Sequence, residues 1–92
     1  MCDSASALLG TCLDAEDSSW AALGYEDRTD YRDACTTWVW EQQLLERDQR
    51  RRGDLQGSGH VQSTCEERDT TLTAPDVTCD DYWSIDWRAP AW

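Results

Sequence analysis

Apolar residues recur at helical spacing along three stretches of this 92-residue chain. In the first stretch, five apolar side chains share one helix face: Ala5, Leu8, Leu9, Cys12 and Leu13. Their i, i+3, i+4, i+7 spacing is typical of an amphipathic helix, which we place over about residues 4–17. Asp3 or Ser4 is the expected N-cap, because both side chains carry an oxygen that can accept a first-turn N–H.

The second stretch predicts the longest helix, over about residues 29–52, and we expect the rest of the chain to be organised around it. Its apolar face contains Tyr31, Cys35, Trp38, Val39 and Leu45. Thr29 is the expected N-cap, and Gly53 follows a group of arginines, as is common at a helix C-terminus. Trp40 and Leu44 widen the apolar surface, which therefore has room for more than one neighbour.

The third stretch predicts a more polar helix over about residues 59–71. Val61, Cys65 and Leu72 lie on one face, and Ser58 is the expected N-cap. This apolar face is narrow, so a covalent bond at Cys65 would help to hold the helix against its neighbours.

The remaining segment, residues 73–92, fits two patterns. Its aromatic residues match both the spacing of a helical turn and the alternation of a strand. We expect a mostly irregular tail, with a short helix as an option, that packs back through its aromatic side chains. The chain as a whole is predicted to be one all-α domain, residues 1–92, with three helices in an up-down arrangement.

The charge is strongly acidic, with 19 Asp and Glu against 8 basic residues, all of them arginine, and a net charge of −11. Such a charge keeps a small domain soluble through self-repulsion. The cluster of four arginines at the end of the long helix is too small, against 19 carboxylates, to indicate direct nucleic-acid binding: Arg47, Arg50, Arg51 and Arg52. No apolar run approaches the length of a transmembrane helix, and the features of a signal peptide are missing.

Five cysteines in a chain of this length indicate a disulfide-stabilised domain from an oxidising compartment. A small core gives marginal stability, so a covalent link would contribute substantially. Four of the cysteines permit three pairings, and the sequence does not choose among them. Our hypothesis pairs Cys12 with Cys35 and Cys65 with Cys79, and the alternative is that these cysteines are buried free thiols.

The sequence predicts no metal site, no cofactor site and no catalytic site. The cysteines lack the close pairs of zinc knuckles, and His60 with Cys65 offers only two ligands. The segment that starts at Asp14 begins like a calcium loop but has Ser19 and Tyr25 at positions that need Gly and Glu. Carboxylates are so abundant that no catalytic pair stands out.

Cys2 is the fifth cysteine. If Met1 stands in place of a signal peptide, Cys2-Asp3-Ser4 is similar to the start of a mature bacterial lipoprotein, in which the first cysteine carries the lipid. The spacing from Cys2 to Cys12, with DACTTWVWEQQL and CEERDTTLTAPDVTC, resembles small cysteine-paired helical lipoproteins of GC-rich bacteria. This resemblance implies an envelope or secreted location, with a membrane contact only through a lipid at Cys2.

Six tryptophans and no phenylalanine are present in this chain. Structural filling of the core accounts for part of this number, and we assign Trp20, Trp38 and Trp83 to the core. Trp40, Trp87 and Trp92 are expected to stay exposed and to anchor a protein partner. Exposed tryptophans also suit stacking on a sugar ring.

Two hypotheses of function follow. The first is a non-enzymatic extracytoplasmic interaction or structural domain, alone or as a subunit of a larger assembly, that binds a protein partner through its tryptophans. The alternative is an acidic cytoplasmic mimic of nucleic acid that inhibits a basic protein and has reduced cysteines. A small hydrolase that relies on carboxylates is the weakest hypothesis.

Overall fold

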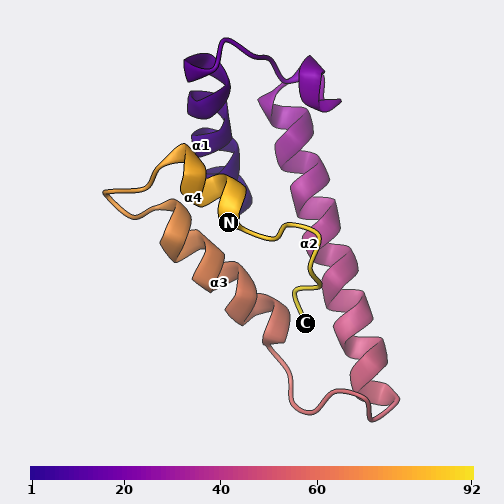
Figure 1. Ribbon diagram of the computed structural model, residues 1–92. Helices are drawn as coiled ribbons and strands as arrows, with labels where there is room; N and C mark the ends of the chain where they lie inside the picture. Colours follow the sequence, from indigo (N-terminus) through magenta and orange to yellow (C-terminus); the bar gives the residue numbers. More distant parts are fainter.

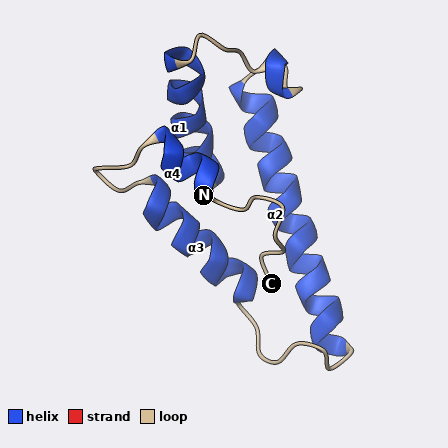
Figure 2. Cartoon of the chain, viewed as in Figure 1, coloured by secondary structure: helices blue, strands red, loops and turns tan.

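The computed structural model describes residues 1–92 and contains helices and no strands (Figure 1 and Figure 2). In chain order the elements are α1 (Cys2–Ala15), the 3₁₀ helix η1 (Ala21–Leu23), α2 (Arg28–Arg51), α3 (His60–Leu72) and α4 (Cys79–Ser84). The predicted all-α class is confirmed. A fourth α-helix joins the three that were expected, because the tail contains α4.

The core is built around α1, which lies against α2, α3 and α4. The predicted apolar face of α1 is confirmed, with Ala5, Leu9, Cys12 and Leu13 all buried. Ser6 is buried beside them, and its hydroxyl donates to the Asp3 carbonyl and accepts from Arg28. The expectation that the longest helix forms the centre is therefore wrong: α1 is the most apolar helix, and it buries more of its surface.

The caps of the first two helices differ from those predicted. Neither Asp3 nor Ser4 caps α1, which begins at Cys2 without a side-chain cap. In α2 the cap is Asp27, whose carboxylate accepts the Asp30 N–H at 2.8 Å, and the predicted cap Thr29 lies in the first turn. A carboxylate serves well here because it accepts a hydrogen bond and also complements the positive end of the helix dipole.

Two polar side chains of α2, Gln42 and Glu46, are buried where an apolar face was expected. The Glu46 carboxylate accepts the backbone N–H of His60 and thereby caps α3, a role predicted for Ser58. The predicted core residue Leu45 is instead 44% exposed. The C-terminal half of α2 thus faces its neighbours with hydrogen-bonding groups, whereas Leu45 is exposed and Leu44 is half-buried.

The tail first forms α4 and then runs without helix between α2 and α3 (Figure 1). Thr78 and Asp81 cap α4 reciprocally, each accepting the backbone N–H of the other. Further along, the Ala91 N–H donates to Gln42, and the Ala91 carbonyl accepts from Thr64 at 2.7 Å. Side chains from two helices therefore hold the main chain of the tail, and the predicted irregular packing is confirmed for residues 85–92.

The molecule is flat and elongated, with principal extents of 47 × 28 × 17 Å. Its radius of gyration is 14.5 Å, whereas a compact chain of this length would have about 12 Å. Its accessible surface is 6051 Å², against about 5,400 Å² for a typical monomer of its mass. The excess arises because α2 spans about 36 Å and extends beyond the shorter helices.

Candidate functional site

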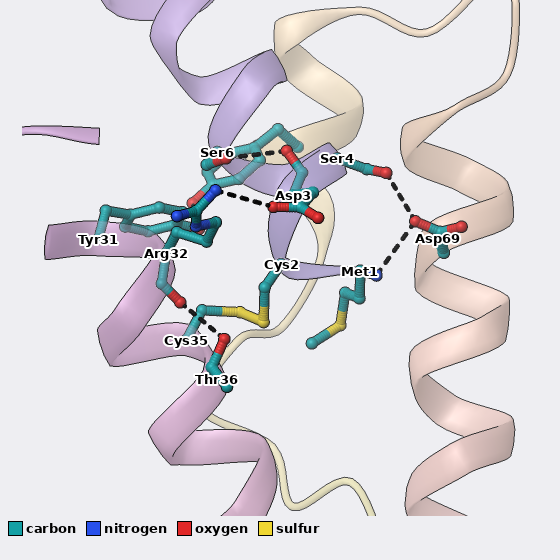
Figure 3. Close-up of a disulfide and its surroundings, with 11 residues drawn as sticks. Met1, Cys2, Asp3, Ser4, Ser6, Tyr31, Arg32, Cys35, Thr36 and Asp69 are labelled. Carbon is teal, nitrogen blue, oxygen red and sulfur yellow. Dashed lines mark hydrogen bonds and ion pairs between the residues drawn. A yellow bond between two sulfur atoms is a disulfide. The ribbon is translucent and has the colours of Figure 1, made fainter. Parts of the chain in front are cut away.

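Two disulfides connect the helices, and neither pairing is the predicted one. Cys2 is bonded to Cys35, which joins the start of α1 to α2, and Cys12 is bonded to Cys79, which joins α1 to α4 (Figure 3 shows the first). The hypotheses Cys12–Cys35 and Cys65–Cys79 are therefore wrong. Helical periodicity identifies which face a cysteine occupies, but the partner depends on the packing of whole helices, which local spacing does not reveal.

The bond at Cys2 also corrects the predicted lipid anchor, because a sulfur in a disulfide cannot carry a thioether-linked lipid. Cys65 is the free cysteine instead. It lies partly buried in a shallow cavity of about 300 Å³ with Met1, Val39 and Val61 among its walls. Burial raises the pKa of the Cys65 thiol, with smaller opposing effects from Arg68 and the N-terminus.

A polar cluster beside the first disulfide ties the start of α1 to α3 (Figure 3). The Asp69 carboxylate accepts the Ser4 hydroxyl at 2.7 Å and forms an ion pair with the Met1 ammonium at 3.2 Å. The Ser4 hydrogen bond, followed by that of the ammonium, lowers the pKa of the Asp69 carboxyl. Together with the bond from Cys2 to α2, this cluster fixes the start of the chain between two helices.

The aromatic side chains gather around a pair of buried tyrosines. The hydroxyls of Tyr31 and Tyr82 lie 2.7 Å apart and share a hydrogen bond. Burial is the main cause that raises the pKa of both phenols, so both stay neutral at physiological pH. Trp87 packs on Tyr82 with ring centroids 5.1 Å apart, and its indole N–H donates to the Tyr82 carbonyl.

A cavity of about 360 Å³, which we call the aromatic cavity, opens beside this pair. None of its lining side chains is charged, and six of the nine are aromatic: Met1, Tyr25, Tyr31, Ala34, Cys35, Trp38, Tyr82, Trp83 and Trp87. They come from the start of the chain, the loop before α2, α2 itself, α4 and the tail. The Cys2–Cys35 disulfide holds two of these segments together at the cavity wall.

Behind two of the cavity rings lies a single arginine. The Arg68 guanidinium carbon is 5.5 Å from the ring centroids of both Trp38 and Trp87. Its Nη2 donates to the Asp86 carbonyl, whereas Nη1 is buried and has no hydrogen-bond acceptor. The two aromatic faces therefore contribute much of what holds this cation.

The tryptophans that were predicted as partner anchors have different surroundings. Trp40 is 60% exposed, as expected. Trp87 and Trp92 are half-buried, and Trp87 packs into the aromatic cluster. Trp83, which was assigned to the core, is 48% exposed at the cavity. The spacing of the tail fitted both a helical turn and a strand, and in the structure α4 turns Tyr82 inward and leaves Trp83 exposed.

A second apolar surface lies on the outer face of α2. Glu41, Leu44, Leu45 and Asp48 form a shallow depression there, and Trp40 precedes Leu44 by one helical turn. Trp40, Leu44 and Asp48 point away from the helix face that carries buried Gln42 and Glu46. Leu45 lies at the edge of this surface, beside Gln42. We call residues 40, 41, 44, 45 and 48 the outer face. It combines three large apolar side chains with two carboxylates.

His60 is not near a set of further ligands. Its Nε2 lies 2.8 Å from the Gln56 carbonyl, within the loop before α3. No three His, Cys, Asp or Glu side chains are grouped so that they could hold a metal ion.

No helix here combines the length and the apolar character that crossing a membrane requires. Comparison with protein-family models, with curated proteins and with solved structures finds no match for this chain. The site must therefore be interpreted from its own geometry.

Proposed function

We propose that this chain is a non-enzymatic, extracytoplasmic interaction domain that binds a basic protein segment on the outer face of α2. The observation that carries this proposal is the uncovered apolar surface of the longest helix. Trp40 and Leu45 are 60% and 44% exposed, on a molecule that has more surface than its mass requires. Large apolar side chains that gather on one exposed face are a mark of interaction sites.

The charges on this face indicate the kind of partner. Glu41 and Asp48 lie on either side of Leu44 and Leu45 along the helix. A partner helix with apolar side chains between arginines or lysines would complement this pattern. A second copy of the chain is a poor partner, because each copy has a net charge of −11.

The two disulfides support the extracytoplasmic part of the proposal, since such bonds persist in oxidising compartments. The resemblance to small cysteine-paired lipoproteins supports the same compartment, without the lipid at Cys2. A cytoplasmic nucleic-acid mimic would have to fold with its cysteines reduced. Protein isolated from its native host should therefore contain one free thiol per chain, and five free thiols would contradict this location.

The binding test uses two designed peptides of about 20 residues with the same leucine stripe, one flanked by arginines and the other by glutamates. Titration calorimetry at low salt should show binding of the arginine peptide alone, with an affinity that falls as salt is added. Trp40→Ala and Leu45→Ala should each weaken it by about tenfold. Leu23→Ala is the matched control, because Leu23 is 41% exposed and lies outside the outer face.

Equal binding of the two peptides would contradict the charge argument. Equal weakening by Leu45→Ala and Leu23→Ala would show that the outer face is not the binding surface. Circular dichroism of each variant should first show an unchanged helix content, so that a loss of binding is not a loss of fold.

A further inference from the structure

The aromatic cavity lies apart from the outer face of α2 and has no role in the function proposed above. We propose that this cavity binds a quaternary ammonium group, such as the trimethylammonium group of a choline-like ligand. The inference stands on the lining of the cavity, on the arginine that two of its rings already hold, and on the charge of the chain.

The lining suits a cation that carries no hydrogen-bond donors. Six aromatic rings and three small or flexible apolar side chains form the wall, and no charged side chain takes part. The lining residue Met1 also carries the N-terminal ammonium, whose charge is paired with the Asp69 carboxylate. The side-chain acceptors of this wall for a primary ammonium are the tyrosine hydroxyls, two of which, those of Tyr31 and Tyr82, already share a hydrogen bond. N–H donors left without an acceptor would weaken its binding. A quaternary ammonium has none to satisfy and presents methyl groups to the rings, whose faces attract its charge. The volume of about 360 Å³ is sufficient for such a group.

Arg68 shows that these rings hold a cation. Its guanidinium lies 5.5 Å from the centroids of both Trp38 and Trp87, and its buried Nη1 has no acceptor. No carboxylate is paired with it in this structure. Arg68 does not line the cavity, but its charge lies behind the wall and repels a second cation. We therefore expect a modest affinity, with dissociation constants on the order of 1–10 mM.

The rest of the chain favours a cation over an anion. Carboxylates adjoin the lining residues in sequence, on the loop before α2 and around α4: Glu26, Asp30, Asp80, Asp81 and Asp86. Of the arginines near these residues in sequence, Arg28 donates to Ser6 and Arg32 pairs with Asp3, whereas Arg88 forms no ion pair. A net charge of −11 then raises the local concentration of cations. An anion would meet both this field and the negative ring faces.

Entry to the cavity is open at Trp83. This side chain is 48% exposed while it lines the cavity, so its removal exposes less of the core than removal of a buried ring would. Its contact with the core is an edge-to-face one with Tyr82, with ring centroids 4.9 Å apart. Its neighbour Tyr82 is buried and supports α4. Trp83 is thus the position at which a ring can be removed from the cavity while the fold is kept.

The test compares choline with 3,3-dimethylbutan-1-ol, in which carbon replaces the charged nitrogen at nearly the same shape. Both are titrated into the folded, oxidised chain at constant ionic strength, and binding is followed by tryptophan fluorescence and by methyl NMR signals. Choline should bind at least about tenfold more tightly than the neutral alcohol. Trp83→Ala should weaken choline binding by about tenfold, and Trp83→Leu should remove the preference for choline over the alcohol.

Trp40→Ala is the matched control, because it removes an exposed tryptophan that does not line the cavity. Choline binding should be unchanged in this variant, whereas binding of the arginine peptide should be about tenfold weaker, so the two proposals can fail separately. Equal binding of choline and the alcohol would overturn the inference, since the cavity would then be only an apolar site. Failure of choline to saturate the chain at about 100 mM would overturn it as well.

Discussion

The bond between Cys12 and Cys79 should be the main support of α4 and of the aromatic cavity. α4 has six residues, too few for a helix to persist alone in water. The disulfide closes a segment with a sequence separation of 67 residues. In the chain-entropy model such a loop contributes about 4 kcal/mol of stability. A domain of this size has about 5–14 kcal/mol in total, so the loss would remove a large share.

The perturbation is the double variant Cys12→Ala/Cys79→Ala, measured by urea unfolding with circular dichroism. Because Cys12 is fully buried, alanine leaves a small void and adds to the loss. We expect the midpoint to fall by about 2–4 M urea. Hydrogen exchange should show that amides of residues 79–84 lose protection first, because only non-covalent contacts, chiefly those of buried Tyr82, then hold α4.

The comparison variant is Cys2→Ala/Cys35→Ala, which removes a loop with a sequence separation of 33 residues. In the chain-entropy model its free energy of unfolding should fall by about 3–4 kcal/mol. Its α4 amides should nevertheless stay protected, since the bond to α1 remains. If the Cys12→Ala/Cys79→Ala variant keeps full protection of α4, or loses less than about 1 kcal/mol, the reasoning is wrong.

Two further predictions follow from the titrating groups. Burial raises the pKa of the Cys65 thiol, so iodoacetamide should label one thiol per native chain slowly at pH 7 and faster as the pH rises; fast labelling at pH 7 would contradict this. The lowered pKa of Asp69 stabilises the fold above the unfolded value of about 3.9, and this contribution is lost as the pH falls through the folded pKa. Urea unfolding at pH 7 and at about pH 2 should therefore show that the free energy of unfolding falls less with acid in Asp69→Asn than in the parent chain. Equal decreases would show that the carboxylate adds no stability.

The sequence alone predicted those structural features that depend on residues close together in the chain. The periodicity of Leu9, Cys12 and Leu13 identified the buried face of α1, because side chains that repeat every three or four residues share one face of a helix. The end of the long helix near Gly53 was predicted for the same kind of reason, since glycine adopts the left-handed backbone found there, with φ of +78°, at low cost. The all-α class followed from such short-range patterns.

The sequence pattern did not predict the cap of α3 or the burial of polar side chains on α2. Glu46 and Gln42 looked like solvated residues, yet they accept hydrogen bonds from His60 and Ala91, which lie 14 and 49 residues further along the chain. A polar side chain is buried when it meets an unpaired backbone group, and that group can come from anywhere in the fold. The spacing around Glu46 contains no sign of this partner.

For the candidate sites, too, the sequence determined some features and the tertiary structure decided the others. The sequence by itself determined that five cysteines, six tryptophans and a charge of −11 share a small helical domain, and it identified Trp40 as exposed. Only the tertiary structure decided which cysteines pair and which rings line a cavity. The physical reason is that disulfides and cavities depend on distances between segments far apart in the chain, whereas periodicity reports only the orientation of a side chain about its own helix.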